Sequence, residues 1–102
     1  MFTAIDHVGV AVYDLDDALV FYAAAFGLRA VHEEVNEELG VREAMLAVGD
    51  GDAQLQLLAP LSDDSPLAKF LSRRGQGIQQ LAYRSRNPKV GSGSKMAVQT
   101  VL

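Results

Sequence analysis

Apolar and polar residues alternate near the start of the chain, and this alternation predicts a strand over residues 5–12. In the stretch IDHVGVAV the valines occupy every second position, while His7 falls on the opposite face, which is the period of two of a β-strand. The spacing then becomes helical. Asp14 and Gly27 are residue types that commonly begin and end a helix, and the expected apolar stripe between them is Leu15, Leu19, Tyr22 and Phe26.

Three further strands are expected after this helix, over residues 29–35, 41–48 and 53–60. Each contains a short apolar stretch, and Asn, Gly and Asp residues separate the stretches, as they do in turns. The element order to this point is strand, helix, strand, strand, strand. We therefore expect an α+β fold with one βαβββ module over residues 1–62.

A second helix and another strand are expected after the module. Ser65 followed by Pro66 is a typical helix start, and this helix would act as a linker over residues 63–76. The stretch GIQQLAYR that follows has the pattern of a strand. Residues 77–102 are expected to hold this first strand of an incomplete second module and a divergent tail. The tail contains a GSGS sequence typical of a linker and an apolar segment over residues 96–102 that could form a strand.

The composition excludes several classes of protein. With 49% hydrophobic and 22% charged residues in a length of 102, the chain has the balance of one globular domain rather than of a disordered protein. No apolar run approaches the roughly 20 residues that span a bilayer. The lack of cysteine excludes disulfides and thiolate ligands. We expect a cytoplasmic protein without a membrane partner.

Charge is distributed unevenly along the chain. The net charge is -4, but all 13 acidic residues lie at or before Asp64, and seven of the nine basic residues follow it. A negative net charge argues against a nucleic-acid partner. The basic second half could attract phosphates such as those of coenzyme A, although scattered Lys and Arg are more often ordinary solvated surface.

Five segments in combination resemble a known family. The segments IDHVGVAVYDLDDALVFYAAAFGL, GVREAML, LQLLAPL, SPLAKFLSRRG and GIQQLAYR, between about Ile5 and Arg84, are similar to those of bacterial methylmalonyl-CoA epimerases. These enzymes belong to the vicinal oxygen chelate superfamily, which also contains glyoxalase I and extradiol dioxygenases. The resemblance implies a glyoxalase-like fold in which paired βαβββ modules surround one divalent metal ion.

The resemblance also implies roles for individual residues. His7, Gln56 and Gln80 match metal-ligand positions of the family, and Glu43 matches one of its two catalytic bases. An amide oxygen is a harder and weaker ligand than imidazole, so Co²⁺ is the preferred ion, with Mn²⁺ or Mg²⁺ as alternatives. The implied reaction is metal-assisted proton exchange at C2 of methylmalonyl-CoA, an acyl-CoA substrate, which interconverts its R and S forms. The family's fourth ligand and second base is a glutamate, and no acidic residue follows Asp64 to supply it.

Without the resemblance, each of these residues has a simpler interpretation. His7 would be an ordinary hydrogen-bonded histidine of a sheet, and Gln56 and Gln80 would be polar strand residues. Glu43 would be an exposed carboxylate. Asp6 precedes His7 on the opposite strand face and is expected to have a structural role.

Two alternative functions therefore stay open. One is a non-catalytic binding module with the glyoxalase fold, which the missing glutamate favours. The other is a glyoxalase I-type lyase, which the segments LQLLAPL and SPLAKFL make less favourable. Whether the chain is an active enzyme is not settled by the sequence.

A second copy of the chain is the expected protein partner. One module and a following strand would leave a sheet face without its opposing half. Either apolar residues such as Leu55, Leu57 and Leu81 would then be exposed, or a strand edge would be left unpaired. We therefore expect a homodimer.

Overall fold

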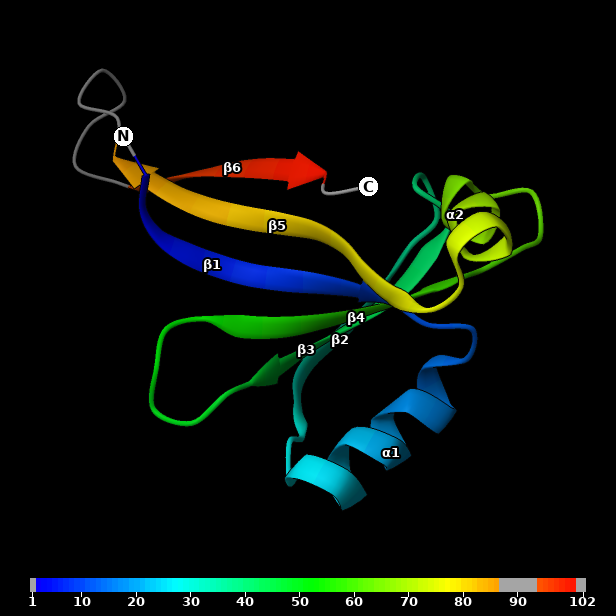
Figure 1. The fold of residues 1–102 in the computed structure, drawn as a ribbon, viewed down its shortest axis with the longest axis horizontal. Helices are drawn as coiled ribbons and strands as arrows, with labels where there is room; N and C mark the ends of the chain where they lie inside the picture. Colours follow the sequence, from blue (N-terminus) through cyan, green and yellow to red (C-terminus); the bar gives the residue numbers. More distant parts are fainter. Residues whose placement is uncertain (1, 87–93, 101–102) are drawn as a thin grey trace.

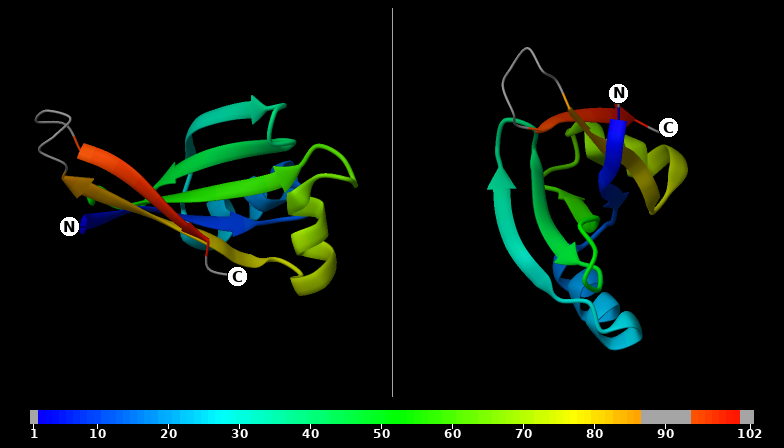
Figure 2. Two further views of the ribbon diagram at one scale, coloured as in Figure 1. Left: turned by 90° about the horizontal axis from the view of Figure 1, so that it is seen from above. Right: turned by 90° about the vertical axis from the view of Figure 1, so that its left-hand side faces the viewer.

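A six-stranded sheet that carries two helices makes up the part of the chain that the structure describes (Figure 1). This computed structural model describes the backbone of residues 2–86 and 94–100 and the side chains of residues 4–83. The strand order is β2-β3-β4-β1-β5-β6, and the sheet twists strongly from one edge to the other (Figure 2). The elements are β1 (Phe2–Ala11), α1 (Leu15–Phe26), β2 (Ala30–Asn36), β3 (Val41–Ala47), β4 (Gln54–Pro60), α2 (Pro66–Arg74), β5 (Gly77–Arg86) and β6 (Ser94–Thr100).

The first five elements form the expected βαβββ module, which confirms the predicted fold class. β1 runs parallel to β4, with His7 opposite Gln54, whereas β2 pairs antiparallel with β3 and β3 with β4. A parallel pair needs a long crossover connection, and α1, β2 and β3 supply it. The first strand of the chain therefore lies inside the sheet rather than at its edge.

Helix α1 begins and ends as its sequence predicts. The side chain of Asp14 accepts a hydrogen bond from the backbone N–H of Asp17 at 2.9 Å, which satisfies one of the free donors at the helix start. Gly27 closes the helix in the left-handed conformation with φ 70°.

The predicted apolar stripe of α1 is correct at its start and wrong at its end. Leu15 is buried, and Leu19 and Tyr22 pack against the core, but Phe26 is 61% exposed. The Phe26 ring contacts the rings of Phe21 and Tyr22 on its own helix instead of the sheet.

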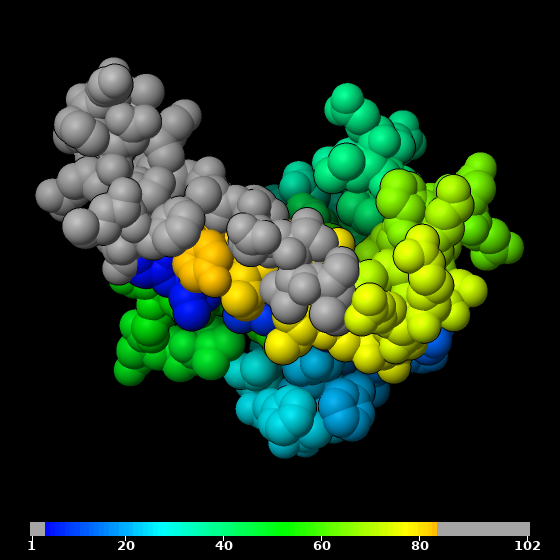
Figure 3. Space-filling model, turned by 45° about the horizontal axis from the view of Figure 1, so that its top comes forward, coloured from blue at the N-terminus to red at the C-terminus, as the bar shows by residue number. Residues whose placement is uncertain are grey.

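Two hydrophobic cores lie on opposite faces of the sheet. Successive residues of a strand point to opposite faces, so Leu57 packs into the core beneath α1 and Leu58 into the core beneath α2. In the space-filling view the blue to cyan atoms of α1 and the yellow atoms of α2 accordingly lie in separate regions (Figure 3). The face opposite α1 is covered by α2 at one end.

The expected exposure of apolar sheet residues is wrong for Leu57, whereas Leu55 and Leu81 are half-buried. Leu57 is completely buried because α1 covers it, and Leu55 packs against the same core. Large apolar side chains are exposed on α1 and β2, including Val20, Phe21, Phe26, Val31 and Val35, and others are exposed in loops and on β1 and β5.

Beyond the module, α2 leads into a β5–β6 pair. Ser65 caps α2 by accepting a hydrogen bond from the backbone N–H of Ala68 at 3.1 Å, as predicted. β5 is antiparallel to both β1 and β6. Most of the GSGS sequence falls within residues 87–93, outside the described residues, and the boundaries at residues 62 and 76 stay predictions. No helix in the described part of the chain is long and apolar enough to cross a membrane.

Candidate functional site

Three of the predicted site residues point to the sheet face opposite α1. Gly9 on β1 is paired with Gln56 on β4 and with Gln80 on β5, and directly paired residues share a face. Met45 on β3 is paired with Gln56, so Glu43, two residues earlier, lies on that face as well. The fold thus brings together side chains from β3, β4 and β5.

Hydrogen bonds join these three side chains in a row across the sheet. Nε2 of Gln80 donates to Oε1 of Gln56 at 3.0 Å, and Nε2 of Gln56 donates to Oε2 of Glu43 at 2.9 Å. Gln56 is buried, so the central link of the row is shielded from water. The row therefore fixes one oxygen of the Glu43 carboxylate.

The row borders a cavity of about 500 Å³ between the sheet and α2. Cavities of this size with mainly apolar walls and a few polar groups commonly bind small molecules. Glu43 is the acidic residue among those that line it. The lining residues are Asn36, Leu39, Val41, Glu43, Gln56, Leu58, Pro66, Leu67, Gln79 and Gln80.

His7 lies on the same sheet face, two residues before Gly9, and its ring is held by Asp6. Nδ1 of His7 donates to Oδ2 of Asp6 at 2.8 Å, and the His7 side chain is 11% exposed. The pairing of β1 with β5 shifts register between Ile5 and His7, and this irregularity breaks the simple alternation that places Asp6 on the opposite face. Asp6 thus orients the imidazole, which leaves Nε2 as the nitrogen that could bind a ligand.

Glu43 has a raised pKa, and its neighbour Glu34 contributes to the shift. Burial is the largest cause, followed by a hydrogen bond and charge repulsion with Glu34, whereas Gln56 and His7 act in the opposite direction. Glu34 is directly opposite Glu43 in the β2–β3 ladder. A carboxyl group with a raised pKa binds a proton more tightly than an ordinary carboxyl group, which favours a role in proton transfer.

Sequence reasoning missed Glu34 as a neighbour of Glu43. Both residues were visible as acids on adjacent predicted strands. Their pairing depends on the register of the β2–β3 hairpin, and the signals of that register in the sequence are the apolar pattern of the two strands and the turn between them.

His7, Gln56 and Gln80 carry donor atoms of the kinds that bind divalent metal ions. His7 offers Nε2, because its Nδ1 proton is held by Asp6, and Gln56 and Gln80 lie next to each other with one amide oxygen apiece. The described residues contain no cluster of three His, Cys, Asp or Glu side chains, because two of the three predicted ligands are amides. This donor set suits a hard or intermediate cation rather than a soft one.

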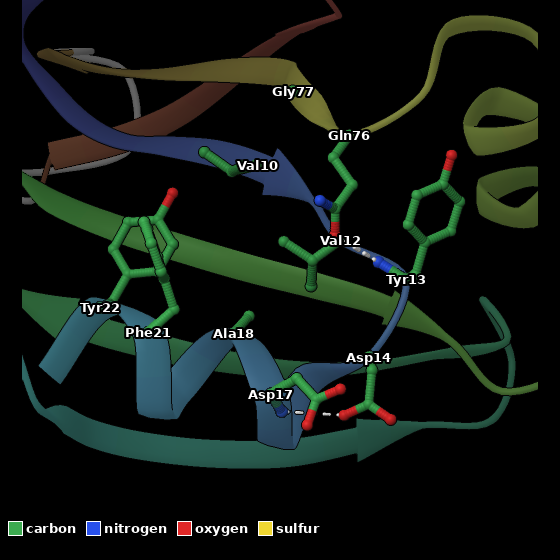
Figure 4. Close-up of a pocket in the computed structure, with 10 residues that line it drawn as sticks. All are labelled: Val10, Val12, Tyr13, Asp14, Asp17, Ala18, Phe21, Tyr22, Gln76 and Gly77. Carbon is green, nitrogen blue, oxygen red and sulfur yellow. Dashed lines mark hydrogen bonds between the residues drawn. The ribbon is translucent and has the colours of Figure 1, made fainter. Parts of the chain in front are cut away.

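A second cavity, of about 520 Å³, lies on the other face between α1 and β1. Figure 4 shows Phe21 and Tyr22 on its one side and Tyr13 and Gln76 on the other. Its two acids are the N-cap residue Asp14 and Asp17 in the first turn of α1, and none of the predicted site residues lines it. The predicted site residues Glu43, Gln56 and Gln80 therefore belong to the first cavity and not to this one.

Comparison with known families gives a match over most of the chain. The sequence model described as the Glyoxalase/Bleomycin resistance protein/Dioxygenase superfamily matches residues 6–91. Among curated proteins, YqjC of Bacillus subtilis is 39% identical over 79 residues, which are 78% of this chain and 55% of YqjC. The mitochondrial methylmalonyl-CoA epimerase of Bos taurus is 37% identical over 72% of this chain and 41% of its own length.

Solved structures of methylmalonyl-CoA epimerases have the same fold. The enzyme from Mycobacterium tuberculosis superposes with a TM-score of 0.79 and 52% identity, over 87% of this chain and 59% of that one. A methylmalonyl-CoA epimerase in complex with methylmalonyl-CoA and NH₄⁺ gives a TM-score of 0.80 and 41% identity, over 88% and 65% of the two chains. The chain spans about half the length of the curated relatives it matches.

Proposed function

The chain belongs to the glyoxalase/bleomycin resistance protein/dioxygenase superfamily, and we propose that it takes part in epimerisation at C2 of methylmalonyl-CoA. The observation that carries this proposal is the row formed by Gln80, Gln56 and Glu43 at the edge of the first cavity, with links of 3.0 and 2.9 Å. Relatives that are methylmalonyl-CoA epimerases support it. They favour it over the binding-module and lyase alternatives.

Glu43 is the proposed base. Its carboxylate accepts the C2 proton, and the electron pair of the broken C–H bond moves into the thioester carbonyl group to give an enolate. Return of the proton to the same face regenerates the starting isomer, whereas inversion needs a proton donor on the opposite face. Glu43 is the acidic residue of the described cavity lining, so we expect a group outside that lining to supply the second proton.

His7, Gln56 and Gln80 are the proposed ligands of a divalent metal ion, with Co²⁺ preferred. When bound, such an ion would stabilise negative charge on the substrate oxygens. Asp6 keeps the His7 ring in the orientation and tautomer that a ligand needs. Glu43 accepts the proton, and the role of Gln56 and Gln80 in this proposal is to hold the Glu43 carboxylate in place beside the substrate.

We also propose a homodimer and a cytoplasmic location. The exposed apolar residues Val20, Phe21 and Phe26 on α1 support an association between copies, because apolar patches of this kind are common at protein interfaces. Sedimentation velocity over a range of protein concentrations tests the dimer, and a single monomeric species at all concentrations would contradict it. The location stays a prediction from the sequence.

Deuterium uptake tests the proposed reaction. The protein is incubated with methylmalonyl-CoA in heavy water with added Co²⁺, and deuterium at C2 is followed by mass spectrometry. Glu43→Gln should abolish uptake above the background rate, because the amide cannot accept the proton. Glu37→Gln changes an exposed turn residue in the same way and should leave uptake unaltered. Equal uptake by the Glu43→Gln variant and the unaltered protein would remove Glu43 from the mechanism.

A further inference from the structure

Gln56 and Gln80 meet although another strand separates them. β1 lies between β4 and β5, and neighbouring strands are about 4.8 Å apart, so the two backbones are separated by roughly twice that distance. Their amide groups nevertheless form a hydrogen bond of 3.0 Å. The β1 residue paired with both of them is Gly9, and the two side chains approach each other above it.

A side chain at position 9 would occupy the space that Gln56 and Gln80 use. A Cβ atom built on Gly9 would lie 2.6 Å from Cγ of Gln80, 3.3 Å from Cδ of Gln80 and 3.1 Å from Oε1 of Gln56. Real Cβ atoms essentially never make contacts closer than 3.0 Å, so one of the two groups would have to shift. The closest atom is Cγ, near the base of the Gln80 side chain, so the whole side chain would have to move.

The backbone does not require glycine at this position. Positive φ angles occur among the described glycines at Gly27, Gly40, Gly49, Gly75 and Gly77, and Gly9 is not one of them. Glycine within a strand weakens the strand, because it adds backbone entropy to the unfolded chain and has no side chain to pack. Its presence here is therefore explained by the close approach of the two amides.

We propose that Gly9 is a positioning residue of the site, whose missing side chain allows the Gln80–Gln56–Glu43 row to form. The expected effect of substituting Gly9 on catalysis, a slower proton exchange at C2, rests on the proposed function. Gly9 acts through Gln80: if Gln80 is displaced, Gln56 loses the donor to its Oε1 atom. The Gln56 amide is then free to turn, and the N–H group that holds Glu43 Oε2 at 2.9 Å is no longer fixed.

The test compares Gly9→Ala with a matched glycine substitution. Gly51 also has an ordinary φ, and a Cβ atom there would meet only the carbonyl oxygen of Val48, at 3.9 Å, so Gly51→Ala is the control. In Gly9→Ala the side-chain NH₂ resonances of Gln56 and Gln80 should shift, and deuterium uptake at C2 should fall by roughly tenfold or more through kcat. Both should stay unaltered in Gly51→Ala.

A double variant separates the contact with Gln80 from general damage to the fold. Gln80→Ala removes the Cγ atom that the new methyl group would strike, so the loss of thermal stability caused by Gly9→Ala should largely disappear when Gln80→Ala is also present. Unchanged Gln56 and Gln80 resonances in Gly9→Ala would overturn the proposal. The proposal would also be overturned if Gly9→Ala lowered the thermal stability equally in the presence of Gln80 and in the Gln80→Ala variant. If the unaltered protein takes up no deuterium, the proposed function fails, while the NMR and stability measurements still decide the role of Gly9.

Discussion

Glu34 and Glu43 face each other across the β2–β3 ladder, so two acids of like charge occupy one cross-strand pair. Such pairs are destabilising when both members are ionised. Burial together with Glu34 raises the pKa of Glu43. The proposed base thus owes its proton affinity partly to a residue outside the lining of the first cavity.

Glu34→Gln should lower the pKa of Glu43 toward its ordinary value. The substitution removes the charge repulsion while it keeps a polar side chain of similar size opposite Glu43. Burial remains, so part of the shift should persist. An NMR titration that follows the side-chain carboxyl carbon of Glu43 measures the change, with Glu37→Gln as the control. A Glu43 pKa that stays the same or rises would contradict the role given to Glu34.

Glu43 should also make stability depend on pH in a defined direction. Its pKa in the folded protein is raised above the ordinary value of 4.5, so the fold favours the protonated form. This contribution is fully present below pH 4.5 and is lost as the pH rises through the raised pKa of the folded state. Glu43→Gln lacks this contribution.

Comparing the unaltered protein with Glu43→Gln separates the contribution of Glu43 to the pH dependence of stability from that of the other acids. The free energy of unfolding of the unaltered protein, minus that of Glu43→Gln, should decrease as the pH rises from below 4.5 toward neutral. Urea denaturation of both proteins at a series of pH values measures this difference in the free energy of unfolding. An increase over this range would mean that the Glu43 carboxylate is stabilised by the fold.

Metal binding should depend on His7 and not on the exposed histidine. Isothermal titration with Co²⁺ should show an affinity loss of at least about tenfold for His7→Ala, because even the partners that orient metal ligands contribute this much. His32 has a side chain that is 60% exposed, and His32→Ala should bind Co²⁺ like the unaltered protein. Equal losses in both variants would point to nonspecific binding and contradict the ligand assignment.

Leu57→Ala should destabilise the protein strongly. Leu57 is completely buried beneath α1, so the substitution should cost about 2–5 kcal/mol in the free energy of unfolding. Leu61 after β4 is 45% exposed, and Leu61→Ala should change it by only about 0.5 kcal/mol. Chemical denaturation of both variants gives the comparison, and a small effect at Leu57 would show that α1 does not pack on the sheet as described.

The elements of the fold could be predicted because their signals are local. Asp14, Gly27 and Ser65 each act within a few residues of their own position. The alternation of apolar residues is also a local signal and predicted the strands, although the observed strand ends differ from the predicted ends by a few residues. The exposure of Phe26 was not visible locally, because it depends on which part of the helix reaches the sheet.

The geometry of the site depends on pairings that the local pattern does not contain. The resemblance to a family selected Glu43, Gln56 and Gln80, and the structure shows that they are in contact. The approach of Glu34 depends on hairpin register, and the contact over Gly9 depends on two strands that are distant in sequence. Neither relationship follows from residue type or periodicity.

The central place of β1 has a consequence for how the protein folds. Val8 pairs with Leu55 on one side and Leu81 on the other, so β1 depends on partners that are synthesised much later than β1 itself. Pairings between distant segments are slow, because the entropy of loop closure is lost before the contacts compensate for it. The expected result is slow refolding compared with a helical protein of this length. During synthesis the segment that carries His7 and Gly9 stays without its sheet neighbours until β4 and β5 have emerged, so it is the part of the site most open to chaperones and to aggregation.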